Sequence, residues 1–222
     1  MRMEEYLQKM GEDWNQRARE NARHFIVNNK VDWTDNEFYA SGEQTVRQDI
    51  LTDMPNVCRG KDPKAMRVLE IGCGAGRVTR ALANVFGEVH AVDVSDEMLR
   101  QARLGLAGTA NAFVYRTDGA TLSVLPDVTF DFAFSCCVFQ HIANYDVIES
   151  YVTEVGKRLV PGGLFKFEVQ GCTKVKSDPS ETWLGVPFSL EQAAKMANKC
   201  GFELRYHAGI EQECFWLWYF KR

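Results

Sequence analysis

Three glycines at alternate positions follow an apolar run that ends at Ile71. They are Gly72, Gly74 and Gly76, and residues 77–86, which favour a helix, begin directly after them. A strand that turns through glycines into a helix presents bare backbone N–H groups and the positive end of a helix dipole to one small pocket. Pockets of this kind suit ligands that resemble nucleotides.

The spacing of this glycine loop narrows the class of ligand. Glu70 precedes Gly-x-Gly-x-Gly, whereas chains that bind NAD or FAD carry Gly-x-Gly-x-x-Gly. This difference favours an adenosyl cofactor without a pyrophosphate. Asp93, at the end of the next expected strand, is placed to accept hydrogen bonds from ribose hydroxyls. Asp118 follows the third expected strand, together with Gly119, and suits the exocyclic amine of a base.

Further polar side chains follow the fourth expected strand. Cys136, Gln140 and His141 lie just beyond residues 130–135. Ligands of doubly wound sheets bind outside the carboxyl ends of the strands, where the strand order reverses. We therefore expect these side chains to share one cleft with the glycine loop, although the sequence separates them.

Strand and helix patterns alternate from residue 66 onward. This alternation predicts right-handed crossovers and a Rossmann-like, doubly wound α/β sheet that is mostly parallel. The expected strands are residues 67–71, 88–92, 112–116, 130–135 and 164–169, and the expected helices are residues 77–86, 96–105 and 145–160.

The last thirty residues break this alternation. Residues 189–192 form a capping box that opens a helix to about Lys199. Two strand patterns follow, at 202–206 and 214–220, and the link between them is too short for a helical crossover. They must therefore run antiparallel to each other.

The first sixty residues have a different character. Apolar residues recur at three- and four-residue intervals over 4–28, which predicts one amphipathic helix. A loop over 33–42 and a second helix over 43–54, stopping before Pro55, are expected next. The sequence thus predicts a helical N-terminal cap over residues 1–60 and a cofactor-binding domain over residues 61–222.

Composition excludes several classes of partner and compartment. The net charge is −4 and no long basic run is present, which argues against binding a nucleic-acid backbone. No apolar stretch approaches the roughly 20 residues of a membrane span, and the N-terminus lacks the apolar core of a signal peptide. The seven cysteines include no Cys-x-x-Cys pair, so we expect free thiols, no metal and a cytoplasmic location.

Taken together, the motifs resemble those of class I S-adenosylmethionine-dependent methyltransferases. The resemblance covers roughly residues 66–222 and implies a seven-stranded sheet whose last strand is antiparallel, with S-adenosyl-L-methionine as the cofactor. The motifs that carry it are Glu70 to Gly76, Val92-Asp93 with Ser95 and Met98, Thr117-Asp118-Gly119, Phe130-Asp131 leading to Phe139-Gln140-His141-Ile142, and Leu159-Val160-Pro161-Gly162-Gly163.

The resemblance also implies contacts with the cofactor. The glycines would pass close to its methionine part, Asp93 would hold the ribose, and Asp118 would bond the adenine amine. Cys136 would offer its backbone to the amino-acid moiety. The full predicted set is Glu70, Gly72, Cys73, Gly74, Gly76, Asp93, Val94, Met98, Asp118, Gly119 and Cys136.

The implied reaction is transfer of a methyl group to O, N or C of an acceptor, expected to be a small molecule. His141 is the candidate general base or substrate orienter, although a histidine that begins a loop often only bonds the backbone. Tyr39, Gln140 and Tyr145 are candidate substrate contacts, and residues 170–187 form a loop of the kind that covers acceptors. Two alternatives stay open, an NAD-dependent oxidoreductase and a non-catalytic scaffold that binds the cofactor. The sequence predicts no oligomeric state.

Overall fold

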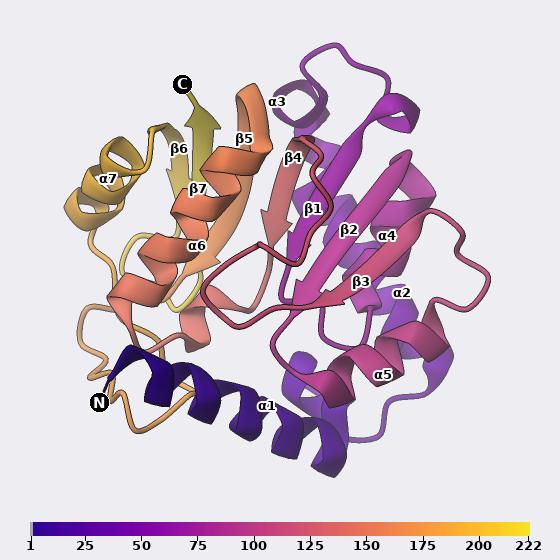
Figure 1. Cartoon of the computed structure of the whole chain (residues 1–222), viewed down its shortest axis with the longest axis horizontal. Coiled ribbons are helices and arrows are strands. Elements are labelled where there is room, and N and C mark those ends of the chain that lie inside the picture. Colours follow the sequence, from indigo (N-terminus) through magenta and orange to yellow (C-terminus); the bar gives the residue numbers. More distant parts are fainter. Residues whose placement is uncertain (1) are drawn as a thin grey trace.

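A computed structural model describes residues 2–222 and contains one seven-stranded sheet with helices on both of its faces (Figure 1). The strand order is β3-β2-β1-β4-β5-β7-β6. The strands are β1 (Arg67–Ile71), β2 (Glu88–Asp93), β3 (Ala112–Arg116), β4 (Phe130–Ser135), β5 (Leu159–Val169), β6 (Phe202–Ala208) and β7 (Phe215–Lys221).

Strands β1 to β5 pair in parallel, and β7 pairs antiparallel with both β5 and β6. The prediction of a mostly parallel sheet with an antiparallel last strand is confirmed. The short link between β6 and β7 allows only this arrangement. The strand order reverses between β1 and β4, and this point is where a doubly wound sheet binds its ligand.

The helices follow the expected alternation from β1 onward. The predicted cap at Ser189 is confirmed, because Ser189 accepts a hydrogen bond from the Gln192 N–H, and Ser95 caps α5 in the same way by accepting one from the Met98 N–H. The helices are α1 (Met3–Ile26), α2 (Asp35–Asp49), α3 (Met54–Cys58), α4 (Arg77–Val85), α5 (Asp96–Gly105), α6 (Tyr145–Arg158) and α7 (Leu190–Lys199), with 3-10 turns η1 (Leu51–Asp53), η2 (Pro63–Ala65) and η3 (Phe139–His141).

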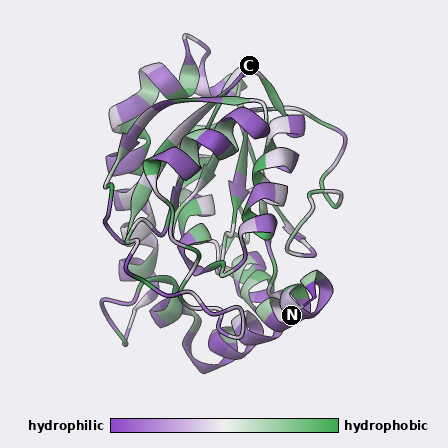
Figure 2. Ribbon diagram, turned by 90° about the vertical axis from the view of Figure 1, so that its left-hand side faces the viewer, coloured by the Kyte–Doolittle hydropathy of each residue, from purple (hydrophilic) through white to green (hydrophobic). Residues whose placement is uncertain are grey.

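Both faces of the sheet are buried, which is typical of parallel sheets covered by helices. Every residue of β4 is buried. Phe132 and Phe134 belong to a core cluster that includes Leu82 of α4, whereas Ala133 belongs to another that includes Val152 of α6. Figure 2 shows hydrophobic residues gathered along the strands and hydrophilic residues on the outer turns of the helices. Within residues 2–222, none of the helices is both long and apolar enough to cross a bilayer.

Helix α2 differs from its prediction. The sequence predicts a loop over 33–42 and a helix from residue 43, whereas α2 begins at Asp35. The physical reason is a capping box: the Thr34 side chain accepts the Glu37 N–H, and the Glu37 carboxylate accepts the Thr34 N–H. The helix therefore starts eight residues earlier than predicted, and Tyr39 lies within it.

Two prolines, Pro55 and Pro161, follow the predicted ends of helices, and the structure differs from the prediction at both. Pro55 lies in the first turn of α3, where the missing N–H of proline breaks no helical hydrogen bond. Pro161 lies within β5, which begins at Leu159 directly after α6, so the helix predicted to reach residue 160 ends at Arg158. In both places the chain continues in regular structure.

The N-terminal helices pack on the sheet domain. Helix α1 runs across the end of the sheet where the arrowheads of β1 and β4 point (Figure 1), and its backbone breaks at Asn21. Asn15 of α1 accepts hydrogen bonds from the Ser95 hydroxyl and the Glu97 N–H, at the beginning of α5. Helix α1 is thereby attached to the sheet near the carboxyl ends of the strands.

Gly42 is where α2 crosses α4, and we predict that Gly42→Ala destabilises the protein. An added Cβ would lie 2.9 Å from Cγ of Arg77 and still closer to the Arg77 backbone, so the two helices would have to separate. Overpacking of this kind costs about 1–3 kcal/mol. Urea unfolding of the two proteins measures the loss.

The matched control is Gly11→Ala in α1, which is also buried. There an added Cβ would lie 3.5 Å from the nearest atom, on Arg116, which is an ordinary contact. We expect no loss of stability, because alanine favours the helix. Equal destabilisation by both substitutions would contradict the close packing of α2 on α4.

Candidate functional site

A pocket lies at the carboxyl ends of β1, β2 and β4, beneath α1. It contains about 800 Å³ of space, including its open mouth. Residues of α1, among them Met10, Trp14 and Ile26, form its cover. Eight of the eleven predicted cofactor contacts line it, namely Glu70, Gly72, Cys73, Gly74, Asp93, Val94, Met98 and Cys136.

Asp93 joins the glycine loop to the end of β2. Its side chain is buried, and its two oxygens accept hydrogen bonds from the backbone N–H groups of Gly74 and Ser95, both at 2.8 Å. Burial raises the pKa of Asp93, while these N–H donors act in the opposite direction. A carboxylate oxygen has more than one acceptor site, so Asp93 can still accept hydroxyl donors from a ligand.

The glycine loop has a backbone that other residues rarely adopt. Gly72 and Gly74 have φ values of 75° and 51°, in the left-handed region. A Cβ on Gly72 would lie 2.8 Å from Cγ1 of Val138, and one on Gly74 would lie 2.8 Å from Cδ1 of Ile26. The loop therefore needs glycine both for its conformation and for the close approach of its neighbours.

Two charged side chains lie behind this loop. Glu70 is buried and accepts a hydrogen bond from the Thr79 hydroxyl at 2.6 Å. Burial raises the pKa of Glu70 to about 7. Arg77 is also buried, and its guanidinium donates to the Ser41 carbonyl at 3.0 Å and to the Thr45 hydroxyl at 2.9 Å. Its Nε has no hydrogen-bond partner among the described residues.

Three predicted cofactor contacts do not line this pocket. Gly76 caps α4, with Ala102 of α5 as its nearest neighbour. The oxygens of Asp118 accept hydrogen bonds within its own turn, from the Ala120 N–H and from Thr121. Gly119 lies under α1, where an added Cβ would be 2.7 Å from Cε of Met10.

A second pocket adjoins the first and contains about 1240 Å³, including its open mouth. Gln140 and His141 line it, together with Trp183 from the loop over 170–187. The two pockets share a set of lining residues, which are Phe25, Ile26, Arg77, Cys136 and Cys137. A ligand in one pocket would therefore contact the walls of the other.

His141 is held against the loop that covers it. Its Nδ1 lies 2.5 Å from the Trp183 carbonyl oxygen, and its ring packs on the Trp183 indole with a centroid separation of 4.6 Å. Burial lowers the pKa of His141 to about 4, against the opposing effect of the carbonyl. The imidazole is therefore neutral at pH 7, with Nδ1–H donated to the carbonyl and Nε2 as the acceptor, 3.5 Å from the Gln140 amide nitrogen.

The two tyrosines predicted as substrate contacts lie outside both pockets. Tyr39 packs between α4 and α5, with the Arg80 guanidinium over its ring and its hydroxyl against Gly105. Tyr145 stacks on Phe188 at a centroid separation of 5.3 Å. Both side chains are used in packing the elements that surround the site.

Several pocket residues have no signal in the sequence that would identify them. Phe25 and Ile26 read as the apolar face of a helix, and Trp183 stands in a loop without a motif. Arg77 directly follows the third glycine, but a basic residue in the first turn of a helix is normally exposed. These residues line the pockets because α1, α2 and the loop over 170–187 pack over the carboxyl ends of the strands.

Comparisons with known proteins agree with this geometry. Residues 68–163 match the family model described as "Methyltransferase domain". Over 126 residues the chain is 31% identical to a ubiquinone biosynthesis O-methyltransferase of Mesorhizobium japonicum, an alignment that covers 54% of this chain and 49% of that protein. A relative of the same description from Sinorhizobium fredii is 30% identical over 111 residues, with 47% of this chain and 44% of that protein covered. The chain spans about half the length of the curated relatives it matches.

Solved structures share the fold over almost the whole chain. Magnesium protoporphyrin IX methyltransferase (ChlM) from Synechocystis PCC 6803 with bound SAM is 15% identical, with a TM-score of 0.69 and coverage of 98% of this chain and 97% of that one. A structure described as the DhpI–SAH complex is 18% identical, with a TM-score of 0.64 and coverage of 96% and 95%. At these identities the likeness shows the fold.

We predict that the buried Glu70 makes stability depend on pH. Its folded pKa of about 7 lies above the ordinary value of 4.5, so on raising the pH the unfolded chain releases this proton first. The contribution of Glu70 to stability is therefore lost between about pH 4.5 and pH 7, by at most about 1.4 kcal/mol per pH unit. In Glu70→Gln this loss disappears.

The measurement is the free energy of unfolding in urea for wild type and Glu70→Gln at pH 5, 6, 7 and 8. The variant should gain stability relative to wild type as the pH rises to 7. Subtracting the unfolding free energies of the two proteins removes the contribution of His141, which is the same in both. That contribution has the opposite sign, since the lowered pKa of His141 reduces stability as the pH falls. Parallel curves would show that Glu70 is ionised in the folded protein.

Proposed function

We propose that the chain is a class I S-adenosylmethionine-dependent methyltransferase, an enzyme that transfers the methyl group of S-adenosyl-L-methionine to an oxygen of a small-molecule acceptor; the match of residues 68–163 to the methyltransferase-domain family model supports this proposal. One observation carries the proposal: the pocket at Asp93 and the glycine loop opens beside a second pocket with shared walls. A donor and an acceptor bound in these two pockets would meet at their boundary. The methyltransferase match also speaks against the oxidoreductase alternative.

In this proposal the cofactor lies in the first pocket. Its ribose hydroxyls donate to Asp93, and its methionine part lies along Gly72 and Gly74, which requires the side chains of Val138 and Ile26 that now contact these glycines to move aside. Val94 and Met98 pack near the adenine. Asp118 and Gly119 would reach the adenine only after Met10 moves, because α1 lies over Gly119.

The acceptor lies in the second pocket. Its walls combine aromatic rings with amide and hydroxyl groups, which suits a ring that carries hydroxyl substituents. Those groups belong to Phe25, Trp33, Trp183, Asn28, Asn29, Gln44, Thr45, Gln48 and Gln140. The relatives, which are ubiquinone biosynthesis O-methyltransferases, support an oxygen as the acceptor atom and a small molecule as the acceptor.

The reaction needs alignment more than acid–base catalysis. A bound donor would supply an electrophilic methyl group: the acceptor oxygen would attack the methyl carbon, both electrons of the carbon–sulfur bond would pass to sulfur, and the hydroxyl proton would pass to solvent. Near-attack alignment of the two reactants can supply about 7–11 kcal/mol of the barrier. His141 offers Nε2 as a neutral acceptor beside the acceptor pocket, and its role is to orient the acceptor hydroxyl.

We further propose that residues 1–60 act as a cap on the domain formed by residues 61–222. Residues of α1 cover the cofactor pocket, and residues between Trp33 and Gln48 form one wall of the acceptor pocket. The cap would then determine which acceptor fits. All seven cysteines are free, which supports a reducing, cytoplasmic location.

We predict that Asp93→Asn weakens binding of S-adenosylhomocysteine about 10- to 100-fold. The substitution replaces a charged acceptor by a neutral amide, and hydrogen bonds to charged groups contribute about 1.5–3 kcal/mol. Isothermal titration calorimetry measures the affinity. The control is Asp127→Asn, an exposed carboxylate far from either pocket, which should leave the affinity unchanged. Unchanged affinity in Asp93→Asn, or absence of binding by wild type at millimolar ligand, would overturn the proposal.

Turnover is tested with S-adenosylmethionine labelled in the methyl group and a fraction of small metabolites from a bacterial extract. Labelled products that depend on the protein are expected, and their absence alongside tight cofactor binding would indicate the non-catalytic scaffold. With an acceptor in hand, His141→Ala should lower kcat/KM at every pH from 6 to 9, because His141 is already neutral throughout this range. Unchanged turnover across that range would remove His141 from the mechanism.

A further inference from the structure

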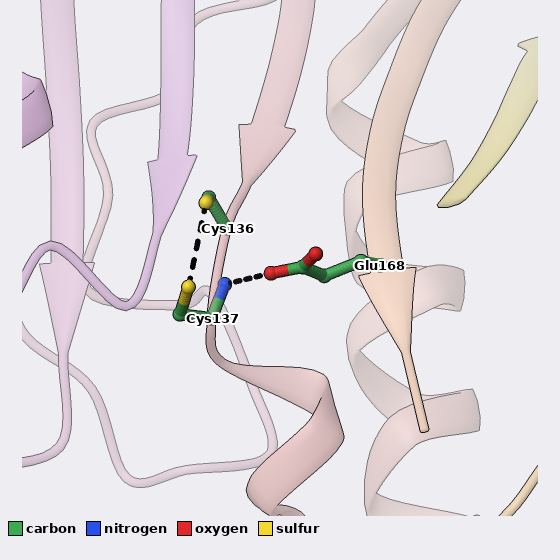
Figure 3. A group of neighbouring side chains, drawn as sticks. All are labelled: Cys136, Cys137 and Glu168. Carbon is green, nitrogen blue, oxygen red and sulfur yellow. Dashed lines mark hydrogen bonds between the residues drawn. The ribbon is translucent and has the colours of Figure 1, made fainter. Parts of the chain in front are cut away.

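Two thiols and a carboxylate meet at the boundary between the two pockets. Cys136 and Cys137 follow the end of β4, and Glu168 lies on the neighbouring strand β5 (Figure 3). The ligand atoms of the three side chains all lie within 4.8 Å of one another. The two Sγ atoms are 3.6 Å apart. We refer to these three residues as the thiol–carboxylate cluster.

The placement of the two thiols depends on an unusual backbone. Neighbouring residues of a strand point to opposite faces of the sheet. Beyond Ser135 the chain leaves β4, and Cys137 has a φ of 59°, in the left-handed region that residues other than glycine seldom occupy. The Cys137 N–H donates to the Glu168 carboxylate, which holds this conformation. Conformations of this kind are concentrated at functional sites.

The separation of the two Sγ atoms fits a bound cation. Zinc binds cysteine sulfur at about 2.3 Å and carboxylate oxygen at about 2.0–2.2 Å in a tetrahedron, so two of its sulfur ligands lie about 3.8 Å apart. The two thiols are already at that spacing. We propose that Cys136, Cys137 and Glu168 form a binding site for a thiophilic divalent cation such as Zn²⁺.

The cluster has the form of an open site. It supplies three protein ligands, and catalytic zinc sites use three ligands and leave the fourth position to water or substrate. Both cysteines line both pockets, so the fourth position faces the cavity. The Glu168 carboxylate is fixed by the Cys137 N–H, which is the kind of second interaction that orients a metal ligand.

The surrounding charges suit this arrangement. Two thiolates and a carboxylate carry three negative charges, and a divalent cation leaves one of them uncompensated. Buried charge needs a partner. Arg77, whose Nε has no partner among the described residues, lines the same two pockets as the cysteines and supplies the remaining positive charge.

If the proposed methyl transfer is correct, the cation has a role in it. A hydroxyl group bound at the fourth position would lose its proton to solvent more readily, as water does on zinc. The acceptor oxygen would then attack the methyl carbon as an anion. The cation would thus promote the deprotonation that His141, a weak base, does not. This part rests on the proposed function, whereas cation binding itself does not.

The test titrates the reduced protein, residues 1–222, with Co²⁺, which replaces zinc and reports thiolate ligands by a charge-transfer absorption band. We expect one equivalent to bind with this band. Cys137→Ser and Glu168→Gln should each weaken binding at least tenfold. Cys172→Ser, a half-buried cysteine outside the cluster, is the matched control and should bind as wild type does.

Each outcome decides the matter. The proposal is overturned if wild type shows no band with one equivalent of Co²⁺, or if the band persists unchanged in both cluster variants. Two cluster variants are used because one of them can fail to fold, which circular dichroism detects. Calorimetry with S-adenosylhomocysteine on the same samples separates the two proposals, since a protein that binds Co²⁺ but not this ligand retains the cation site and loses the methyltransferase assignment.

Discussion

The carboxylate of Asp93 is the interaction on which the ligand pocket depends. It accepts one N–H from the glycine loop after β1 and another from the turn after β2, so that two neighbouring strand ends are joined through a single side chain. Neither N–H belongs to the regular bonding of the sheet, and both would otherwise be buried donors without a partner. Leaving such a donor unsatisfied costs about 1–3 kcal/mol. The same carboxylate thus shapes the pocket and remains available to a ligand within it.

The packing of the two N-terminal helices, α1 and α2, also depends on the glycine loop. Ile26 of α1 lies directly on Gly74, and Gly42 of α2 lies directly on Arg77, so both N-terminal helices contact the segment that leads from β1 into α4. The Arg77 guanidinium donates back to Ser41 and Thr45 of α2. The first pocket and the N-terminal helices are therefore assembled around the same few residues. A change in α1 or α2 that alters the second pocket will also alter the first pocket, because the two pockets share walls.

Much of the fold could be predicted because its signals are local. The glycine loop, the caps at Ser95 and Ser189 and the short link between β6 and β7 each specify their structure within a few residues. The errors arose where two local signals compete. The capping box at Thr34 favours a helix, whereas the aromatic residues and glycine that follow it favour a loop. Packing of this segment on α4 stabilises the helix.

Some residues of the site could likewise be predicted from local signals in the sequence, and others could not. The residues at the strand ends could be predicted, because a parallel sheet brings its carboxyl ends to one edge. The second pocket could not be predicted, since Trp183 and the residues of α1 and α2 reach it only through tertiary packing that no short motif encodes. The pairing of Glu168 with two adjacent cysteines is a further case, because strand periodicity would separate the thiols and only the left-handed turn at Cys137 unites them. Side chains brought together by tertiary packing are therefore the part of the site that sequence motifs do not predict.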